Sequence, residues 1–315
     1  MRSNNSKSLQ RRQRKNDQIK ICSWNVRSLY ADKKEEQLAD TLSIFGADIT
    51  ALQEMRWIGN GISQNRDFDI YFSCHEKHHL LGVGFLVGKK LKDSVIGFNN
   101  ISDRLCTLRL RSRFYNISII NVHCHTEDSN DQEKDNFFDQ IENAVNACPR
   151  HDVKIVLGDF NAKIGRQPEY RQITGAHSLH EFSNDNGQRT IELAASLNMV
   201  VASTRFPRKD IHKWTWTSPD GVTRNQIDHV LINNRYLSCL SHVRSYRGAN
   251  CDSDHFLVGA AFRARIASKK IDQKERSVKI NTEALKVDVT QQKYAENLEQ
   301  VLEVQNINEA TVEEM

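Results

Sequence analysis

Residues 158–161 read Gly-Asp-Phe-Asn and hold the most informative pair of polar side chains in the chain. An apolar run ends here, and we expect Asp159 and Asn161, two residues apart, on the same side of an extended backbone. A carboxylate can take a proton from water, and a carboxamide can orient that water or a substrate oxygen. The pair therefore indicates water-activating chemistry at the end of a strand.

Chemistry of the same kind recurs at the ends of other apolar runs. Asn25 follows one run, Glu54 follows another, Asp228 lies within a third, and Asp254 and His255 precede a fourth. Strand ends that face a common crevice are the usual place for such groups in sheet enzymes. One carboxylate at a strand end is most simply a cap or turn residue, but the recurrence favours a shared site.

Together these side chains supply the parts of metal-assisted phosphodiester hydrolysis. Hard oxygen ligands such as Glu54 suit Mg²⁺, which keeps several waters and the substrate phosphate as ligands. A carboxylate that is not on the metal can activate the attacking water. A histidine oriented by a buried carboxylate can stabilise the negative charge that grows on the phosphate.

An alternation of strand-like and helix-like segments must position these groups. The continuous apolar run 153–157 is typical of a strand that is covered on both faces. Many strands with interspersed helices predict two packed sheets with helices on their outer faces, an α/β fold. The predicted strands are 19–24, 48–53, 68–73, 82–87, 105–110, 117–122, 153–157, 199–202, 226–232 and 256–262, and the predicted helices are 33–45, 131–148 and about 189–196.

Length and composition favour one large domain with tails. The chain has 315 residues, 38% of them hydrophobic, which is enough for a sizeable core, and no long Gly- or Pro-rich linker. We expect a disordered basic arm at 1–18, the main domain at 19–266, and a charged linker with an amphipathic helix at 267–315. The last segment has no catalytic-looking cluster and is interpreted as a linker or a docking segment for a protein partner.

Positive charge is concentrated at the N-terminus. The net charge is +4, but residues 1–20 alone sum to +6 and the other 295 residues to −2, so affinity for a polyanion must come from this arm or from a local patch. A cluster of carboxylates that faces such a substrate would need a bound cation. The basic run suits a nuclear-import signal or a phosphate-binding arm, with a solvated tail as the plain alternative; its members are Arg11, Arg12, Arg14 and Lys15.

The cysteine pattern and the hydropathy of the chain indicate where in the cell the protein is located. The seven cysteines are odd in number and scattered without a C-x-x-C motif, which favours free thiols in a reducing compartment. No apolar run reaches the roughly 18 residues that a membrane span needs. The N-terminus also lacks the apolar segment of a signal peptide. We therefore expect an intracellular protein without a membrane partner, located in the nucleus, with the cytoplasm as a second location.

Two other patterns are interpreted as structural. The run from Cys74 to His79 holds metal-capable side chains, but no second Cys/His pair at zinc-finger spacing accompanies it, which favours a polar hairpin. Trp214 and Trp216 could share one face of a strand, and we interpret them as core or pocket wall rather than as a base-stacking platform.

Several motifs, in this order, resemble the endonuclease/exonuclease/phosphatase superfamily: W-N at 24–25, L-Q-E at 52–54, G-D-F-N at 158–161, Asp228 and S-D-H at 253–255. More narrowly, W-N-V-R-S-L, L-Q-E-M-R-W, S-N-D-N-G-Q-R and R-N-Q-I-D-H-V-L-I resemble the apurinic-type endonuclease domain of RTE/BovB-type non-LTR retrotransposons. The resemblance covers about residues 19–265 and implies a four-layered α/β sandwich of the deoxyribonuclease I type, with DNA as partner. Residues 279–288 resemble the linker that such elements place before their reverse transcriptase, which would make 267–315 a contact for that enzyme.

The resemblance also implies roles for individual residues. Glu54 would be the main Mg²⁺ ligand, with Asp254 contributing and Asn25 close by, and Mn²⁺ could replace Mg²⁺. Asp159 would activate or orient the attacking water, and Asn161 would hold water and phosphate.

The resemblance assigns two histidines to the scissile phosphate. The resemblance implies that His255, paired with Asp228, stabilises the scissile phosphate. His123 stands where many members of the superfamily place a tyrosine on that phosphate.

Two positions depart from the family pattern. Arg27 stands where apurinic enzymes often have an aspartate near the metal, and it could contact a DNA phosphate instead. Cys124-His125 replaces an Ala-Pro pair, and the loss of proline is expected to free the adjoining loop and weaken positioning without abolishing the chemistry.

The sequence thus predicts a Mg²⁺-dependent DNA endonuclease that nicks one strand and leaves 3′-hydroxyl and 5′-phosphate ends. It would be the endonuclease portion of a non-LTR retrotransposon or a host protein derived from one. One alternative keeps the fold and changes the substrate to another phosphoester. The other is a domesticated nuclear protein that binds chromatin or a partner through residues 1–20 and 267–315, with weak or no nuclease activity.

Overall fold

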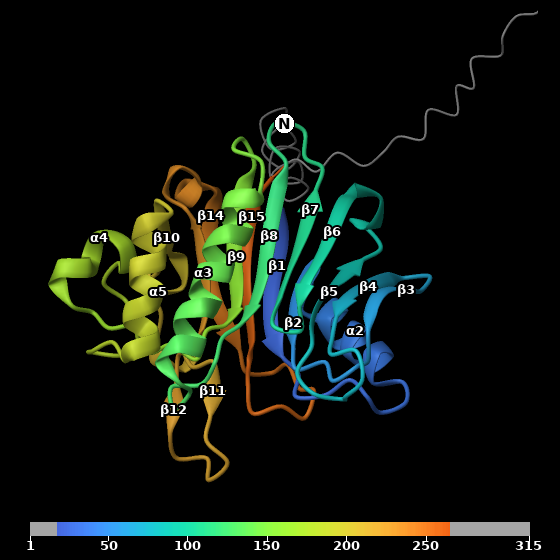
Figure 1. The fold of residues 1–315 in the computed structure, drawn as a ribbon, viewed down its shortest axis with the longest axis horizontal. Helices are drawn as coiled ribbons and strands as arrows, with labels where there is room; N and C mark the ends of the chain where they lie inside the picture. Colours follow the sequence, from blue (N-terminus) through green and yellow to red (C-terminus); the bar gives the residue numbers. More distant parts are fainter. Residues whose placement is uncertain (1–17, 265–315) are drawn as a thin grey trace, which may run out of the picture. The chain divides into compact units, whose positions relative to one another are not determined.

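A computed structural model describes residues 18–264 (Figure 1). The expectations for the basic arm, which include Arg11, Arg12, Arg14 and Lys15, lie outside the described residues. The amphipathic helix predicted within 267–315 also lies outside them. The domain boundaries proposed from the sequence therefore remain predictions.

Two mixed β-sheets form the centre of the described part of the chain. The seven-stranded sheet has the order β14-β15-β1-β2-β5-β4-β3 and the six-stranded sheet has the order β10-β13-β9-β8-β7-β6. The strands of the first are β1 (Gln18–Asn25), β2 (Ile49–Gln53), β3 (Asn60–Gln64), β4 (Phe68–Ser73), β5 (Val83–Gly88), β14 (Leu240–Tyr246) and β15 (Leu257–Arg263). Those of the second are β6 (Val95–Ser102), β7 (Leu105–Leu110), β8 (Ile117–His123), β9 (Val153–Asp159), β10 (Met199–Val201) and β13 (Asp228–Asn233).

Helices and one short hairpin complete the fold. A two-stranded ribbon of β11 (Trp216–Thr217) and β12 (Arg224–Asn225) precedes β13. The α-helices are α2 (Lys34–Ile44), α3 (Asp131–Ala147), α4 (Arg171–Thr174) and α5 (Asp185–Ser196), and the 3₁₀ turns are η1 (Lys92–Ser94), η2 (Pro168–Tyr170), η3 (Ala202–Thr204), η4 (Asp210–His212) and η5 (Asn234–Cys239). Among residues 18–264, no helix is both long and apolar enough to cross a membrane.

Three apolar clusters define four layers. The central cluster joins the facing sides of the two sheets, with Ile21 and Phe85 from one sheet and Ile119 and Leu157 from the other. A second cluster lies between the six-stranded sheet and helices α3 and α5. The third lies between the seven-stranded sheet and α2, where Leu38 is buried. The predicted four-layered sandwich of the deoxyribonuclease I type is therefore confirmed.

Two βαβ units bring strand ends to one edge of the sandwich. Strands β1 and β2 are parallel and connected through α2, and β8 and β9 are parallel and connected through α3. The carboxyl ends of each parallel pair lie side by side, as the register of His123 with Asp159 shows. Strand β13 runs antiparallel to β9 and starts at the same edge, where Asp228 pairs with Asp159. Polar groups far apart in the chain thus meet at one edge.

The main differences from the predicted elements are strands that the sequence pattern did not indicate. Strands β3 and β6 are largely exposed at sheet edges, so they lack the run of apolar residues that reveals a buried strand. Strand β14 was missed as well, and its buried positions are interrupted by polar residues. Helix α5 begins at Asp185, earlier than predicted, because the side chain of Asn184 accepts a hydrogen bond from the Gly187 amide and caps it.

Candidate active site

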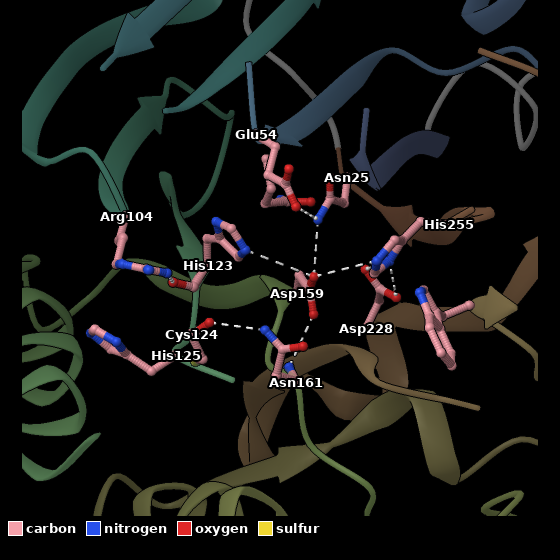
Figure 2. Close-up of polar contacts among 12 residues, drawn as sticks. Asn25, Glu54, Arg104, His123, Cys124, His125, Asp159, Asn161, Asp228 and His255 are labelled. Atoms are coloured by element: carbon pink, nitrogen blue, oxygen red, sulfur yellow. Dashed lines mark hydrogen bonds and ion pairs between the residues drawn. The ribbon is translucent and has the colours of Figure 1, made fainter. Parts of the chain in front are cut away.

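The polar groups singled out in the sequence converge at the edge where β1, β8 and β9 end. Figure 2 shows the side chains of Asn25, His123 and His255 directed toward Asp159, with Glu54 beyond Asn25. Asp159 is only 2% exposed, and Asp228 behind it is 1% exposed. The structure therefore assembles one cluster from residues that span more than two hundred positions of the chain.

Asn25 connects the two carboxylates of this cluster. Its side-chain amide donates to Asp159 Oδ2 at 3.1 Å and to Glu54 Oε1 at 3.0 Å. Its oxygen accepts a hydrogen bond from the Arg27 amide at 3.1 Å, which fixes the orientation of the carboxamide. Asn25 therefore separates Glu54 from Asp159 and holds both at a defined distance.

His255 lies between two buried carboxylates. Its Nδ1 is 3.1 Å from Asp228 Oδ2, and its Nε2 is 3.6 Å from Asp159 Oδ2. Burial by itself would lower the pKa of His255, but the charges of Asp228 and Asp159 outweigh it and raise that pKa to about 9. The imidazole is therefore a cation at neutral pH, and the Asp228 carboxylate fixes its ring orientation.

Asp159 and His123 respond to the same environment in opposite ways. Burial, together with the charge of Asp228, raises the pKa of Asp159 above its usual range despite the neighbouring histidines. Burial lowers the pKa of His123, although the charge of Asp159 opposes this. His123 Nε2 is 4.0 Å from Asp159 Oδ2, and its Nδ1 is buried without a hydrogen-bond partner among residues 18–264. His123 is therefore a neutral ring whose polar edge faces the cluster.

The expectation of an extended backbone at residues 159–161 is wrong. The strand ends at Asp159, and Asn161 has a φ of +48°, in the left-handed region. The Asn161 amide donates to Asp159 Oδ1 at 3.0 Å, which closes a turn that asparagine tolerates well. The Asn161 side-chain amide donates to the Cys124 carbonyl at 2.9 Å. The two side chains are brought together by a turn, and the nitrogen of Asn161 is used to hold the neighbouring loop.

Gly158 has a steric role in this turn. Its φ is +153°, and a Cβ on this residue would lie 1.9 Å from the carbonyl oxygen of Val122. Only glycine lets β9 approach β8 this closely immediately before Asp159.

Glu54 and Asp254 are the carboxylates that fit a divalent cation. Glu54 has a φ of +52°, and although burial opposes it, hydrogen bonds from Asn25 and Arg56 keep its pKa below the usual value. Asp254 Oδ2 accepts a hydrogen bond from the Trp216 indole at 3.2 Å, while Oδ1 is buried and lacks a hydrogen-bond partner among the described residues. Carboxylate oxygens of this kind suit Mg²⁺, and the free Oδ1 of Asp254 provides a position for it.

A second group of potential ligands is less suited to a metal. The side chains of Asp159, Asp228 and His255 have ligand atoms within 4.8 Å of one another, close enough to hold an ion. His255, however, is already hydrogen bonded to Asp228, and a protonated ring has no lone pair to give. Asp254 Oδ1 has no such hydrogen bond among residues 18–264, which makes Asp254, with Glu54, the better candidate.

Two arginines compensate these carboxylates. Arg56 contacts Glu54 Oε2 at 2.9 Å, and Arg27 lies 3.6 Å from Asp254 Oδ2 with 54% of its side chain exposed. Both arginines have positive φ values, as Glu54 and Asn161 do, and such conformations concentrate at functional sites. Arg27 thus replaces the expected aspartate with a charge that pairs with Asp254, and its exposure is compatible with the predicted phosphate contact.

The loop at 123–125 is held in place by residues that the sequence analysis did not assign. The buried side chain of Asn186 donates to the carbonyls of His125 at 2.9 Å and of Asn161 at 3.2 Å. The Cys124 amide donates to the Asp159 carbonyl at 2.8 Å. These hydrogen bonds hold the loop in place although it lacks the proline of the family pattern. The motif S-N-D-N-G-Q-R pointed to this region, but not to the role of Asn186.

A buried polar bridge joins the two sheets below the site. Gln53, which precedes Glu54, donates to Asn121 Oδ1 at 2.7 Å. Asn121 in turn donates to the carbonyls of Leu52 and Gly84 at 2.9 and 2.8 Å. In the sequence, the only sign of this bridge is a polar residue near the end of each apolar run, Gln53 in one and Asn121 in the other.

The tryptophans at 214 and 216 belong to different parts of the site. Trp216 is in β11 and forms a bridge with His255, so it is wall of the site as expected. Trp214 precedes the strand, so the two rings do not share one strand face. In the Cys74–His79 run, His75 Nδ1 accepts hydrogen bonds from the amides of Lys77 and His78, which closes a turn.

Comparison with curated proteins identifies relatives of the whole domain. The protein named craniofacial development protein 2 from Tragulus javanicus is 33% identical over 248 residues, which cover 78% of this chain and 42% of that protein. The protein of the same name from Bos taurus is 32% identical over 265 residues, which cover 84% of this chain and 44% of that protein. The chain thus spans less than half the length of these relatives.

Solved structures share the fold at low sequence identity. The catalytic domain of Xenopus laevis APE2 aligns with a TM-score of 0.62 and 17% identity, covering 80% of this chain and 94% of that one. The endonuclease domain of TRAS1, a telomere-specific non-LTR retrotransposon, aligns with a TM-score of 0.57 and 14% identity, covering 78% and 98%. The 3′ phosphatase NExo from Neisseria, bound to a product DNA hairpin, aligns with a TM-score of 0.56 and 20% identity, covering 78% and 99%.

The sequence profile of the Endonuclease/Exonuclease/phosphatase family matches residues 22–255, which include every residue of the cluster around Asp159. Because this match covers well over half of the chain, the protein belongs to the Endonuclease/Exonuclease/phosphatase family.

Proposed function

We propose that this protein is a Mg²⁺-dependent endonuclease that hydrolyses one phosphodiester bond of DNA and leaves 3′-hydroxyl and 5′-phosphate ends. The observation that carries the proposal is the buried cluster in which Asn25 contacts Glu54 and Asp159, and Asp159 lies next to the Asp228–His255 pair. It supplies a base, a cation and a separate set of oxygen ligands within one site, and these are the groups that phosphodiester hydrolysis by water requires.

Asp159 is the group that we assign to the attacking water. Its raised pKa makes the carboxylate a stronger base than an ordinary aspartate. The Asn25 amide and the Asn161 backbone amide each hold one of its oxygens, so its direction is fixed. Asn161 keeps its side-chain oxygen for water, because its nitrogen is bonded to the loop at Cys124.

His255 and His123 are assigned to the phosphate. A cationic His255 stabilises the additional negative charge of the transition state, and Asp228 holds the proton on Nδ1, which leaves the proton on Nε2 to point into the site. A neutral His123 can donate one hydrogen bond to a phosphate oxygen without adding a second charge.

Glu54 and Asp254 would hold Mg²⁺, which would polarise the phosphate and stabilise the leaving oxygen. Asp254 Oδ1 has no other partner among residues 18–264, and the hydrogen bonds from Asn25 and Arg56 that lower the pKa of Glu54 favour its ionised form. Mn²⁺ accepts the same oxygen ligands and is expected to substitute.

The biological setting is part of the proposal. The likeness to the TRAS1 endonuclease domain and the relatives named craniofacial development protein 2 support an origin in a non-LTR retrotransposon, as a fragment or as a host protein derived from one. We infer that the protein acts in the nucleus, and that residues 267–315 contact a protein partner such as a reverse transcriptase. The DNA hairpin bound by NExo supports DNA as the substrate.

Purified full-length protein tests the proposal on supercoiled plasmid. We expect open-circular product with Mg²⁺, none with EDTA, and sealing of the product by DNA ligase, because ligase requires 3′-hydroxyl and 5′-phosphate ends. Asp159→Asn should slow the nicking strongly. Plasmid that stays supercoiled with Mg²⁺ and with Mn²⁺ would contradict the proposal.

One observation favours a second candidate, a nuclear binding protein with little nuclease activity. Arg56 and Arg27 already pair with Glu54 and Asp254, so an entering cation must compete with two guanidinium groups. Calorimetric titration with Mg²⁺ separates the two candidates, since a nuclease must bind the ion at millimolar concentration or below. A domain that takes up no Mg²⁺ but binds chromatin would support the second candidate.

A further inference from the structure

Beside the active site, Trp214 is flanked by two arginines. The guanidinium of Arg224 lies 4.0 Å from the centre of the Trp214 ring and that of Arg247 lies 5.6 Å from it. Both arginines are exposed, and among residues 18–264 neither forms an ion pair with a carboxylate. Stacking fixes the two side chains in place while leaving their N–H groups available to a ligand.

More positive charge gathers next to this stack. Arg244 Nη2 lies 2.7 Å from His212 Nδ1, and burial together with the charges of Arg244, Arg247 and Arg208 lowers the pKa of His212. Lys209 is a further contributor to that shift.

These cations have little acidic compensation. Asp210, next to Lys209 in the chain, is paired with Lys213 at 2.9 Å, and Asp228 is paired with His255 at 3.1 Å. Arg208 Nε is buried without a hydrogen-bond partner among residues 18–264. Like charges this close repel one another, so an arrangement without carboxylate partners indicates that an anion completes it.

The cationic group is attached directly to the active site. Thr215, the residue after Trp214, accepts hydrogen bonds from the amides of Ile227 and Asp228 through its hydroxyl, at 2.9 and 3.0 Å. The next residue, Trp216, donates to Asp254. A small cavity is lined by Thr215 and Asp228 together with Arg208, Lys213 and Arg244. Figure 1 shows β11 and β12 projecting beyond the sheets at this edge.

We propose that Arg208, Lys209, Arg224, Arg244 and Arg247, arranged around Trp214, form a binding surface for the phosphodiester backbone of DNA next to the scissile bond. The inference rests on the proposed function and extends it. A small phosphoester fills the site at Asp159 and needs no further cations, whereas a DNA strand continues past the site for several phosphates. Arginine forks match phosphate oxygens in pairs, which explains the excess of arginine over lysine here.

The double variant Arg224→Ala/Arg247→Ala tests the surface by fluorescence anisotropy with a labelled duplex, without Mg²⁺. Loss of two phosphate contacts should reduce the slope of log affinity against log salt by about 2 and weaken binding roughly tenfold at low salt. The matched control is Arg113→Ala/Arg235→Ala, because these exposed arginines also stack on rings, of Phe114 at 5.6 Å and Tyr236 at 5.5 Å, at the opposite end of the sandwich. The control should bind as the unaltered protein does.

Both single variants and a thermal melt accompany the double variant, so that a folding defect is recognised. Unchanged affinity and salt slope in folded Arg224→Ala/Arg247→Ala would overturn the inference. So would an equal loss of binding to polyglutamate of similar length, since that would mark a surface for acidic proteins. Single-stranded DNA is measured in parallel, and a weaker effect there is expected because only a duplex presents two backbones.

Failure of the proposed function would be visible separately. If the unaltered protein does not nick plasmid but loses duplex affinity with the double variant, the surface stands and the nuclease proposal falls. If nicking occurs, the double variant should raise KM for plasmid several-fold and leave kcat on a small chromogenic phosphodiester unchanged, because it touches none of the groups around Asp159.

Discussion

At the scale of single residues, the site depends on how Asn25 shares its amide. One nitrogen donates to Glu54 and to Asp159, so the carboxylate assigned to the metal and the carboxylate assigned to the water are neighbours with a fixed spacing. Their environments differ: hydrogen bonds keep the pKa of Glu54 low, whereas burial raises the pKa of Asp159. Two carboxylates with diverging pKa values are typical of sites where one binds a cation and the other moves a proton.

The first prediction separates these two roles. Glu54→Gln should raise the Mg²⁺ concentration needed for half-maximal nicking, because a ligand charge is lost. Asp159→Asn should leave that concentration unchanged and lower kcat by about 10²- to 10⁴-fold, the usual contribution of a general base. Mg²⁺ titrations of the nicking rate measure both effects. Asp139→Asn on the exposed face of α3 is the control and should change neither. Equal shifts in Mg²⁺ requirement for both variants would show that Asp159 is itself a ligand.

At the scale of elements, helix α5 acts on the site through its first turn. Asn186 reaches from the start of the helix to the carbonyls of His125 and Asn161 and so joins the loop that carries His123 to the turn that follows Asp159. Gly187 permits this approach, because a Cβ there would lie 2.0 Å from the Lys163 carbonyl oxygen.

The second prediction concerns this tether. Asn186→Ala removes two hydrogen bonds, and only the Asn161 carbonyl keeps another donor, Asn184 Nδ2 at 3.5 Å, so the free energy of unfolding should fall by about 2 kcal/mol. It should also lower kcat at least tenfold with little change in KM, because the groups that surround the phosphate lose their spacing. Urea denaturation and steady-state nicking measure the two effects.

Thr190→Val provides the matched control for that variant. The Thr190 hydroxyl is buried in the same helix but bonds only to the Asn186 carbonyl at 2.7 Å. The variant should lose about 1 kcal/mol of stability and keep its kcat. A similar kcat loss in Thr190→Val would mean that general stability of α5, rather than the Asn186 contacts, sets the rate.

The third prediction concerns the close approach of β8 and β9. Gly158→Ala forces a methyl group against the Val122 carbonyl and should lower the free energy of unfolding by about 3 kcal/mol or prevent folding. Gly97→Ala in β6 is the comparison, because its Cβ would meet only Arg109 Cβ at an ordinary 3.9 Å. That substitution should be close to neutral in urea denaturation. A tolerated Gly158→Ala would contradict the tight packing before Asp159.

At the scale of the whole molecule, the site exists only because the two sheets, each of which carries part of it, are held in a fixed position relative to each other. Glu54 and Asn25 come from one sheet and Asp159 and Asp228 from the other, and the Gln53–Asn121 bridge ties the sheets together beneath them. Polar side chains at full burial in such a bridge cost stability unless every group is paired, so the bridge specifies one register of the sheets.

The fourth prediction uses a buried histidine to report on global stability. His229 Nδ1 is 2.8 Å from Ser203 Oγ and its Nε2 is 2.8 Å from the Ala162 carbonyl oxygen. Burial lowers its pKa to about 4, and burial also lowers the pKa of His180 to about 4. The unfolded chain therefore binds protons near pH 6.5 that the folded protein does not accept, and stability falls as pH decreases from about 6.5 to 4.

Urea denaturation at several pH values measures this loss. His229 alone should contribute up to about 1.4 kcal/mol per pH unit within that window. In His229→Gln the stability should depend less on pH between 6.5 and 4 than in the unaltered protein, although the variant is less stable at pH 7. An identical pH dependence in both proteins would show that folding does not lower the pKa of His229.

Local pattern was enough to predict most of the fold that surrounds the site. Apolar runs such as 153–157 gave the buried strands, and the apolar face of α3 identified its helix. The exposed strands β3 and β6 could not be predicted in this way, because an edge strand buries little and shows no apolar run. The polar residues at strand ends were recognised by type and position alone.

What the sequence determined by itself is the chemistry available: a carboxylate and an amide in G-D-F-N, further carboxylates and histidines at other strand ends, and the family they belong to. Only the tertiary structure decided which of them touch and in what state. The left-handed turn at Asn161, the raised pKa of His255 between two carboxylates, the tether through Asn186 and the arginines around Trp214 all arise from contacts between distant segments. Burial and the approach of charges set these properties, and both depend on how the two sheets pack rather than on any local stretch of residues.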